Sequence, residues 1–559
     1  MKMDGTSVKR ERFEADVVIA GAGVAGLSTA IRLFQQVESH NQRIESGEAQ
    51  GEKLSAPQVM VIEKGADIGN HVLSGAVIDP VALTELLPDY REKGAPIRAE
   101  VVHNPFYFFT SKNALKLPFT PPGMGSKGCH LVSLAEFTRW MSKVAESQGV
   151  QLFNGFAAVD LLREGNAVKG IRLGDKGIDK HGHPRPNALY GDEIAAGVTV
   201  LAEGVHGCLT RQAVKDLGLS APMPQATVLG IKEIVQLPEE RLKPGTAMHS
   251  FGFPHDSATY GGGFVYSLPG NQAAIGLATG LDYRDPLLDM HELFVKWKLH
   301  PFMKKLLRDG KVIEYGAKTI PEGGYYSIPV LASDGLVIVG DGAGLLNSIR
   351  LKGVHLAIRS GMAAGDAIFR ALCTKSFTRE KLQIYPEAFF KSWAGRELRR
   401  VRNLHQCFHL GRMGGMAGIA LHTASFGLLP AGRLAIHPER DSLHSLKKNP
   451  QNSPFKQDAL MLDKLSDVFL SGTVHDEEQP SHITVTDTQV CEQKCKPEFD
   501  CPCTRFCPAQ VYEWIEEEKR IRVNFTNCLH CQTCETKDPY GNIIWKLPEG
   551  EGGPKYKNM

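Results

Sequence analysis

Three cysteines, Cys528, Cys531 and Cys534, stand three residues apart near the end of the 559-residue chain. Zinc sites use two ligand pairs held apart by a dozen or more residues, so a third closely spaced cysteine is surplus to zinc. The bacterial ferredoxin run C-x2-C-x2-C-x3-C-P contains such a triplet. Its fourth position is Asp538 here, followed by Pro539. The run predicts one iron–sulfur cluster and the loss of a ligand for a second.

An earlier, degenerate run supplies the missing ligand of the remaining cluster. In two-cluster ferredoxins the fourth cysteine of one run binds the other cluster, and Cys507 precedes a proline in "RFCPAQ". We therefore expect one 4Fe-4S cluster held by Cys507, Cys528, Cys531 and Cys534. A structural zinc site made by four cysteines is the alternative. The other site of the template would keep only Cys503.

Three further cysteines, Cys491, Cys495 and Cys501, have no place in this template. A labile disulfide, an extra metal site and inert buried thiols are all open for them. The other four of the 12 cysteines are scattered singly, as reduced thiols in a cytosol-like compartment usually are. These are Cys129, Cys208, Cys373 and Cys407. The N-terminal sequence has no apolar core of a signal peptide and too many acids for a transit peptide, so we expect a reducing compartment.

Composition limits the class of protein. The length suggests three or four domain-sized units, some of which can be interleaved. Hydrophobic residues make up 42% and charged residues 23%, as in an ordinary globular protein. The formal net charge is +2, and no segment concentrates enough lysine and arginine to neutralise many phosphates. We expect no nucleic-acid partner.

A dinucleotide-binding turn lies close to the N-terminus, in "ADVVIAGAGVAGLSTAIRLF". Residues 17–20 predict a buried strand and residues 27–34 a helix, and Gly21, Gly23 and Gly26 form G-x-G-x-x-G between them. Such glycines let the backbone approach a pyrophosphate, which lies at the positive end of the helix.

The acidic residue that should hold the ribose comes late, as Glu63 at the end of "QVMVIEK". Residues 35–57 are polar and rich in turn formers, so we interpret them as a surface loop inserted before the second strand.

Two later stretches indicate which dinucleotide is bound. Residues 198–209 and 335–368 each predict a buried strand that runs into a glycine turn, and they resemble the later motifs of glutathione-reductase-type flavoproteins. In that resemblance Asp341 holds the ribityl chain of the flavin. No second G-x-G-x-x-G follows a strand, so NAD(P)H has no evident site. We expect FAD as the cofactor and another protein as the electron donor.

The middle of the chain predicts a sheet and two membrane-contacting segments. Residues 257–283 alternate aromatic and apolar residues between glycines, and residues 261–263 are either a bulge or a close approach to a ligand. Residues 104–125 are rich in aromatic residues, and residues 413–432 carry no Asp, Glu, Lys or Arg. Met413, Met416, Ala420 and Ala424 follow a helical repeat. We favour a helix that dips into one leaflet over a buried core helix or a true span.

Taken together, the motifs closely resemble the electron-transfer-flavoprotein:ubiquinone oxidoreductase family. The most specific pieces are "TYGGGF", "RFCPAQVYE" and "NCLHCQTCETKDP". The resemblance implies FAD, one 4Fe-4S cluster, ubiquinone as acceptor and electron-transfer flavoprotein as partner. It places quinone contacts at Tyr260, Gly261 and Gly262, and membrane contacts near residues 106–125 and 409–432. It also implies a monotopic protein on the cytoplasmic face of a bacterial inner membrane, equivalent to the mitochondrial matrix face.

The expected fold class is α/β and α+β. A discontinuous Rossmann-like FAD-binding domain of the glutathione-reductase type would take residues 1–105, 135–225 and 330–400. A sheet-based quinone-binding and membrane-contacting region would take residues 106–134, 226–329 and 401–450, and a ferredoxin-like domain residues 451–559. Two rivals are a prenyl-lipid reductase with the same FAD fold and a membrane-attached interaction module whose cysteines hold zinc.

Overall fold

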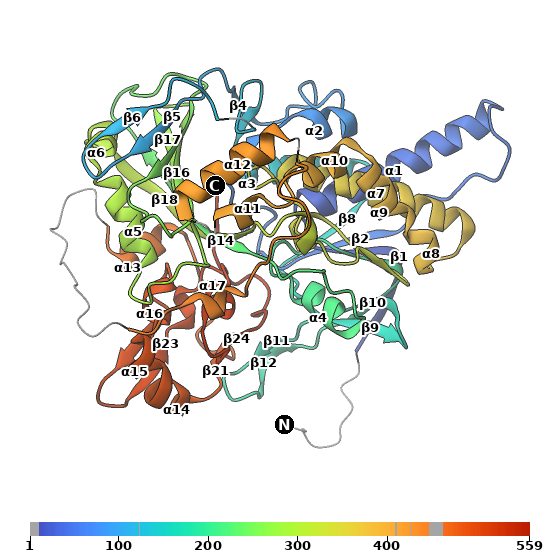
Figure 1. Cartoon of the computed structure of the whole chain (residues 1–559). Coiled ribbons are helices and arrows are strands. Elements are labelled where there is room, and N and C mark those ends of the chain that lie inside the picture. The colour runs from blue at the N-terminus through green and yellow to red at the C-terminus, as the bar shows by residue number, and fades with distance from the viewer. Residues whose placement is uncertain (1–9, 122, 409–410, 426, 447–461) are drawn as a thin grey trace.

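The computed structural model describes residues 10–121, 123–408, 411–425, 427–446 and 462–559 (Figure 1). Its largest sheet has the strand order β19–β20–β13–β1–β2–β8, and β10 and β9 extend from β13. The bounds are β19 (Ala332–Ser333), β20 (Leu336–Ile338), β13 (Glu193–Leu201), β1 (Arg12–Ala20), β2 (Val59–Glu63), β8 (Gln151–Asn154), β10 (Ala167–Leu173) and β9 (Ala158–Glu164). From β20 to β8 all neighbours are parallel. Such buried strands require continuous apolar runs, which "VVIA" and "VMVI" supply.

Helix α1 (Val24–Glu45) corrects the prediction for residues 35–57. Residues 35–45 continue the helix, and only the segment from Ser46 onward is a connection. The polar residues there include Gln, Glu and Arg, which are good helix formers, and residues 35–46 contain no glycine or proline. Polarity marked an exposed helix face rather than a loop.

Helix α7 (Val354–Thr374) packs against α1 at very close range. A Cβ on Gly361 would lie 2.4 Å from the Ala25 oxygen, and one on Gly365 would lie 2.9 Å from the Thr29 oxygen. Outside this contact, Arg32 forms an ion pair with Asp366 at 2.6 Å. The two helices fix the strand-to-helix turns that lead into each of them.

A second sheet has the order β18–β14–β17–β16–β15–β5–β6 and is antiparallel except where β15 pairs with β5. Its strands are β18 (Lys311–Pro321), β14 (Thr227–Gln236), β17 (Gln272–Gly280), β16 (Gly261–Leu268), β15 (Ala247–Gly252), β5 (Phe106–Phe109) and β6 (Ala114–Lys116). The sheet predicted for residues 257–283 is the β16–β17 pair. Its register has no shift, so residues 261–263 are not a bulge.

The remaining helices and small sheets connect these layers. The helices are α2 (Val81–Leu86), α3 (Leu134–Ser147), α4 (Cys208–Asp216), α5 (Met290–Lys298), α6 (Pro301–Leu307), α8 (Arg379–Leu382), α9 (Ile384–Lys391), α10 (Trp393–Arg400), α11 (Leu404–Cys407) and α12 (Gly411–Ala424). The strands are β3 (Val77–Ile78), β4 (Ile97–Glu100) and β7 (His130–Val132) in one sheet and β11 (Lys176–Ile178) and β12 (Pro184–Leu189) in another.

The C-terminal part forms two small sheets, β21–β24 and β22–β23, at the lower left of Figure 1. Its elements are α13 (Lys464–Leu470), β21 (Ile483–Val485), α14 (Thr488–Val490), the π-helical turn Cys491–Cys495, α15 (Lys496–Phe499), α16 (Cys503–Phe506), β22 (Tyr512–Ile515), β23 (Arg520–Val523), α17 (Thr533–Lys537) and β24 (Ile543–Trp545). The end of the chain returns to the nucleotide-binding half, where the Ala135 N–H donates to the Met559 oxygen at 3.0 Å.

Candidate functional site

The turn between β1 and α1 contains three glycines, and only one of them has free space beside it. Gly21 has φ +110°, and a Cβ there would lie 2.4 Å from the Ala202 oxygen. A Cβ on Gly26 would lie 2.3 Å from the Gly21 oxygen, so Gly26 permits close packing of strand and helix. A Cβ on Gly23 would meet nothing within 4 Å, and no side chain caps the helix there. The first N–H groups of α1 therefore have room for a pyrophosphate.

Two acidic residues lie at the same sheet edge as this turn. Glu63 ends β2, and its Oε2 accepts a hydrogen bond from the Ala22 N–H at 3.1 Å. Asp341 follows β20, in the turn Gly340–Ala343. Burial raises the pKa of Asp341 to about 6, and the charge of Lys318 opposes the rise. Because β20, β1 and β2 are parallel, both carboxyl groups lie beyond the carboxyl ends of their strands, where open α/β sheets bind nucleotides.

These residues fit FAD, for which they would hold the pyrophosphate, a ribose and the ribityl chain. FAD, when bound, supplies both one-electron and two-electron chemistry. Sequence analysis missed Glu203, whose carboxylate accepts hydrogen bonds from the N–H groups of Leu209 and Thr210 at 3.1 and 2.8 Å. That carboxylate fixes the turn between β13 and α4.

The four predicted cluster ligands converge within the C-terminal part. Cys507 follows α16, Cys528 and Cys531 lie in the loop before α17, and Cys534 lies in α17. All four are buried. Burial and the neighbouring thiols raise the pKa of Cys507 to about 11 and that of Cys528 to about 12. Such thiols need a compensating positive centre to ionise, as a metal centre supplies.

Hydrogen-bond donors point at two of these sulfurs. The His530 N–H donates to Cys528 Sγ and the Thr533 hydroxyl to Cys531 Sγ, each at 3.4 Å. Burial raises the pKa of Cys534, and the nearby Tyr512 hydroxyl opposes this rise. Donors of this kind tune the reduction potential of iron–sulfur clusters.

Spacing distinguishes a cluster from a single metal ion. Among the described residues, only His475, His482 and His530 place three ligand atoms within 4.8 Å of one another. No three of the four thiols come that close, whereas tetrahedral zinc with 2.3 Å bonds would need sulfurs about 3.8 Å apart. An iron–sulfur cube holds its cysteine sulfurs roughly 6 Å apart. The four thiols therefore fit a 4Fe-4S cluster.

A half-buried lysine and a buried histidine join the cluster loop to the nucleotide site. Lys64, next to Glu63, lies 3.4 Å from Nδ1 of His530 and over the ring of Trp545. His530 in turn lies 2.9 Å from His475, between their Nε2 atoms. Burial lowers the pKa of Lys64 and of both histidines. The imidazoles are neutral and form a hydrogen-bonded contact between the two sites.

Strand β18 makes a second connection. The Thr319 hydroxyl donates to the Cys531 oxygen at 2.8 Å. Its neighbour Lys318 is half-buried. Desolvation lowers the pKa of Lys318 to about 8, while the charges of Cys531, Glu63 and Asp341 oppose the fall. At neutral pH this lysine is charged and lies between the thiols of the cluster site and the acidic residues of the FAD site. Nothing in the spacing along the sequence pointed to Lys64 or Lys318.

The predicted quinone contacts lie at the start of β16, where Tyr260 precedes the strand and Gly261 and Gly262 begin it. A Cβ on Gly261 would lie 2.6 Å from His255 Nε2, and one on Gly262 would lie 2.7 Å from the Ser250 oxygen. Both glycines are therefore required by packing within the sheet. A larger residue at Gly262 would displace β15, so such a change cannot report on a ligand alone.

Tyr260 lies in a buried polar network that the sequence did not reveal. Its ring packs edge-on against His405 and Phe408, with centroids 5.0 and 4.8 Å away. Burial and the nearby Glu322 carboxylate raise the pKa of Tyr260. His405 lies 3.6 Å from Glu322 and 3.8 Å from Asp282, and these carboxylates raise the pKa of His405 despite its burial.

Helix α12 comes a few residues after His405 in the sequence. One side of this helix packs against the protein and the other side is exposed. Nε2 of buried His422 lies 2.7 Å from the Arg400 oxygen. Leu421, Leu428 and Leu429 are 50%, 67% and 44% exposed. The side chains of Met413 and Met416, which the sequence analysis used, lie outside the described residues. Leu115 and Phe119, in the first aromatic segment, are 55% and 61% exposed.

The membrane prediction therefore rests on these exposed side chains. Figure 1 shows α12 and the β5–β6 pair in the upper part of the molecule. Within the described ranges, no helix combines the length and apolar character needed to cross a bilayer.

A nucleotide-binding sheet that is joined through Lys64 and His530 to a four-thiol site defines a flavoprotein with an iron–sulfur cluster. Family models described as "Electron transfer flavoprotein-ubiquinone oxidoreductase, 4Fe-4S" and "ETF-QO, ubiquinone-binding" match residues 458–557 and 228–320. The electron transfer flavoprotein-ubiquinone oxidoreductases of Dictyostelium discoideum and Pseudomonas aeruginosa are 40% and 39% identical, over 98% and 99% of this chain and 92% and 100% of their own. The chain belongs to the electron transfer flavoprotein-ubiquinone oxidoreductase family.

Solved structures show the same fold at much lower identity. A geranylgeranyl bacteriochlorophyll reductase-like protein from Thermoplasma acidophilum is 17% identical and covers 76% of this chain and 93% of its own, with a TM-score of 0.55. The myxobacterial chondrochloren halogenase, an FAD-dependent enzyme, is 15% identical over 76% of this chain and 95% of its own, with a TM-score of 0.52. The predicted FAD-binding fold is confirmed, and at these identities the likeness concerns the fold alone.

Proposed function

We propose that the protein accepts electrons from reduced electron-transfer flavoprotein and passes them through a 4Fe-4S cluster and FAD to ubiquinone. The observation that carries this proposal is the direct contact between the cluster loop and the FAD site. Lys64 adjoins Glu63 and contacts His530, which stands between two cluster cysteines. A cluster held by these cysteines would therefore lie next to the FAD site.

The residues of the chain position the cofactors rather than take part in covalent chemistry. Gly23 leaves room for the pyrophosphate at the start of α1, while Glu63 and Asp341 bind the sugar hydroxyls. Lys64 and Lys318 place positive charge between the two sites. Because each electron adds negative charge, these lysines stabilise the reduced forms.

The Tyr260 network supplies protons for the quinone. Reduction of a quinone to a quinol consumes two electrons and two protons. Glu322 and Asp282 raise the pKa of His405 despite its burial, which favours its protonated form. The Tyr260 hydroxyl and the His405 imidazolium are therefore donors next to the turn at Gly261, and the two carboxylates hold the imidazole in place.

The protein reaches its lipid-soluble substrate by resting on a membrane. The exposed leucines of α12 and its following turn, Leu421, Leu428 and Leu429, support this part of the proposal, as do Leu115 and Phe119. Apolar side chains on a short helix enter the interfacial layer of one leaflet. We place this surface on the cytoplasmic face of a bacterial inner membrane, and we propose the same three-part division of the chain as in the sequence analysis.

A steady-state assay tests the function. Electron-transfer flavoprotein reduced by an acyl-CoA dehydrogenase should drive reduction of a short-chain ubiquinone analogue by the purified protein. NADH in place of the flavoprotein should give almost no reduction. Rapid reduction with NADH alone would replace this proposal with an NADH dehydrogenase.

A further inference from the structure

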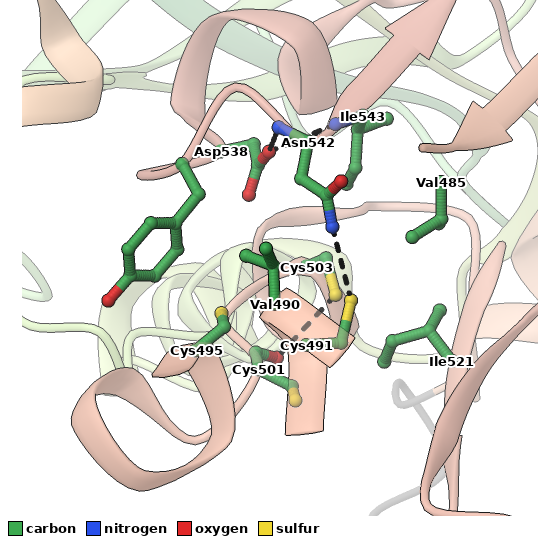
Figure 2. Close-up of a pocket in the computed structure, with 11 residues that line it drawn as sticks. Val485, Val490, Cys491, Cys495, Cys501, Cys503, Ile521, Asp538, Asn542 and Ile543 are labelled. Carbon is green, nitrogen blue, oxygen red and sulfur yellow. Dashed lines mark hydrogen bonds between the residues drawn. The ribbon is translucent and has the colours of Figure 1, made fainter. Parts of the chain in front are cut away.

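The C-terminal part contains four cysteines besides the predicted cluster ligands, and all four line one pocket. Cys491, Cys495, Cys501 and Cys503 surround it together with Asp538. Figure 2 shows Asp538 and Asn542 on one side of this pocket and the four cysteine side chains on the other. All four thiols are buried and none forms a disulfide. Four buried cysteines around a single space are more than packing requires.

The pocket lies where a two-cluster ferredoxin, with its two cysteine runs, would hold its second cluster. In that template, the fourth residue of each run serves the other cluster. Cys507 follows this rule, because it joins the triplet of the later run. Asp538 occupies the corresponding fourth position of the later run, and it lines this pocket with Cys503. Cys491, Cys495 and Cys501 occupy the same pocket although their spacing departs from the template.

Asp538 is already engaged by the backbone. Its Oδ2 accepts hydrogen bonds from the N–H groups of Asn542 and Ile543, the latter at 3.0 Å. The carboxylate thus maintains the turn after α17. The four thiols are left as the groups that are free to bind a metal centre.

The backbone around these thiols adopts conformations that are uncommon in proteins. Cys491 and Cys495 lie at the two ends of a π-helical turn, a form that is rare and frequent at functional sites. Asp500 and Cys501 have φ of +54° and +50°, in the left-handed region that non-glycine residues rarely adopt. Two consecutive residues of this kind cost on the order of 1–3 kcal/mol each, and such strain persists mainly at functional sites.

Hydrogen bonds and charges around the pocket suit bound thiolates. The Asn542 side-chain amide donates to Cys491 Sγ at 3.5 Å. Cys501 lies near two cations, because Lys496 pairs with Asp500 at 2.7 Å and Arg505 donates to the Asp500 oxygen at 2.7 Å. Cationic and amide groups of this kind offset the negative charge that four cysteinates bring to a metal centre.

We propose that Cys491, Cys495, Cys501 and Cys503 hold a second iron–sulfur cluster. The Cys495 and Cys501 thiols are hydrogen-bonded to each other, but no three of the four sulfurs lie within 4.8 Å of one another among the described residues. A zinc ion would need all four about 3.8 Å apart. The position of Cys503 in the two-run template therefore favours an iron–sulfur centre. Cys503 begins α16 and Cys507 directly follows it, so the two clusters are neighbours.

The test is the metal content of the protein purified without oxygen. The wild type should contain about eight irons and eight acid-labile sulfides per FAD, twice the content of a single 4Fe-4S cluster. Cys491→Ser with Cys495→Ser should reduce both to about four while FAD stays bound. Cys373→Ser, which alters an exposed cysteine of α7, is the matched control and should leave the iron content unchanged.

Paramagnetic resonance of the reduced protein gives a second readout. Two neighbouring reduced clusters should broaden each other's signal, and the double variant should show the sharp signal of one cluster. Four irons per FAD in the wild type would overturn the proposal. So would four irons with one zinc, or a Cys495–Cys501 disulfide found by thiol counting and mass spectrometry in freshly purified protein.

Discussion

Lys318 offers a sharp test of how the cluster and FAD sites are coupled. Lys318→Met removes one half-buried positive charge and keeps a side chain of similar length. The charge of Cys531 acts on this lysine, and the adjacent Thr319 is hydrogen-bonded to the Cys531 backbone. The reduced cluster carries one more negative charge than the oxidised cluster, so losing the lysine should disfavour reduction.

The size of the effect follows from this position. Two unit charges on the order of 8 Å apart, at an effective dielectric of about 20, interact by about 2 kcal/mol. For a one-electron couple, about 1.4 kcal/mol corresponds to about 59 mV. The cluster potential should therefore fall by about 85 mV.

A redox titration followed by paramagnetic resonance measures this shift. Lys232→Met is the matched control, because burial likewise lowers the pKa of Lys232 to about 8 while the only charge acting on it is that of Glu314. The control should leave the potential unchanged. If Lys318→Met moved the potential upward, or by less than about 20 mV, the proposed electrostatic coupling would be refuted.

Four other predictions concern single parts of the proposal. Gly23→Val should abolish FAD binding and keep the cluster, because the new side chain fills the open space at the start of α1; retained FAD, measured by absorbance, would contradict this. Cys531→Ser should remove the predicted cluster's iron and its visible absorbance while FAD remains bound. Leu421→Asp with Leu428→Asp should move the protein from membrane pellets to the soluble fraction, whereas a double Leu→Ala change should not. His405→Gln should lower kcat with the quinone at least roughly tenfold, the usual lower range for a lost proton donor, while reduction of the enzyme by the flavoprotein stays intact. In the wild type, quinone reduction should decline as pH rises through the raised pKa of His405, because the proton is present below that pKa and absent above it. A pH profile of the same shape in His405→Gln would exclude His405 as the donor.

Short motifs predicted the cofactors because their chemistry is concentrated in a few adjacent residues. The glycine turn at residues 21–26 and the triplet at residues 528–534 each combine residue type with a spacing that few other structures need. The buried strands were equally visible, since parallel strands require continuous apolar runs. The polar half of α1 was missed because an exposed helix face and a loop have similar compositions.

Contacts between distant segments could not be predicted in this way. Thr319 and Cys531 are 212 residues apart in the sequence and meet only because β18 packs against the cluster loop. The same holds for Tyr260, His405 and Glu322, which come from three separate segments. The roles of individual site residues, and the division of the chain into three parts, stay predictions.

The direction of electron flow is the central claim, and a two-step rapid-mixing measurement tests it most directly. The oxidised protein is first mixed with reduced electron-transfer flavoprotein and then with a short-chain ubiquinone analogue, while flavin and cluster absorbance are followed. We predict that both centres are reduced in the first step and reoxidised in the second, with quinol formed in proportion. Failure of the flavoprotein to reduce either centre, or failure of the quinone to reoxidise them, would contradict the proposed function.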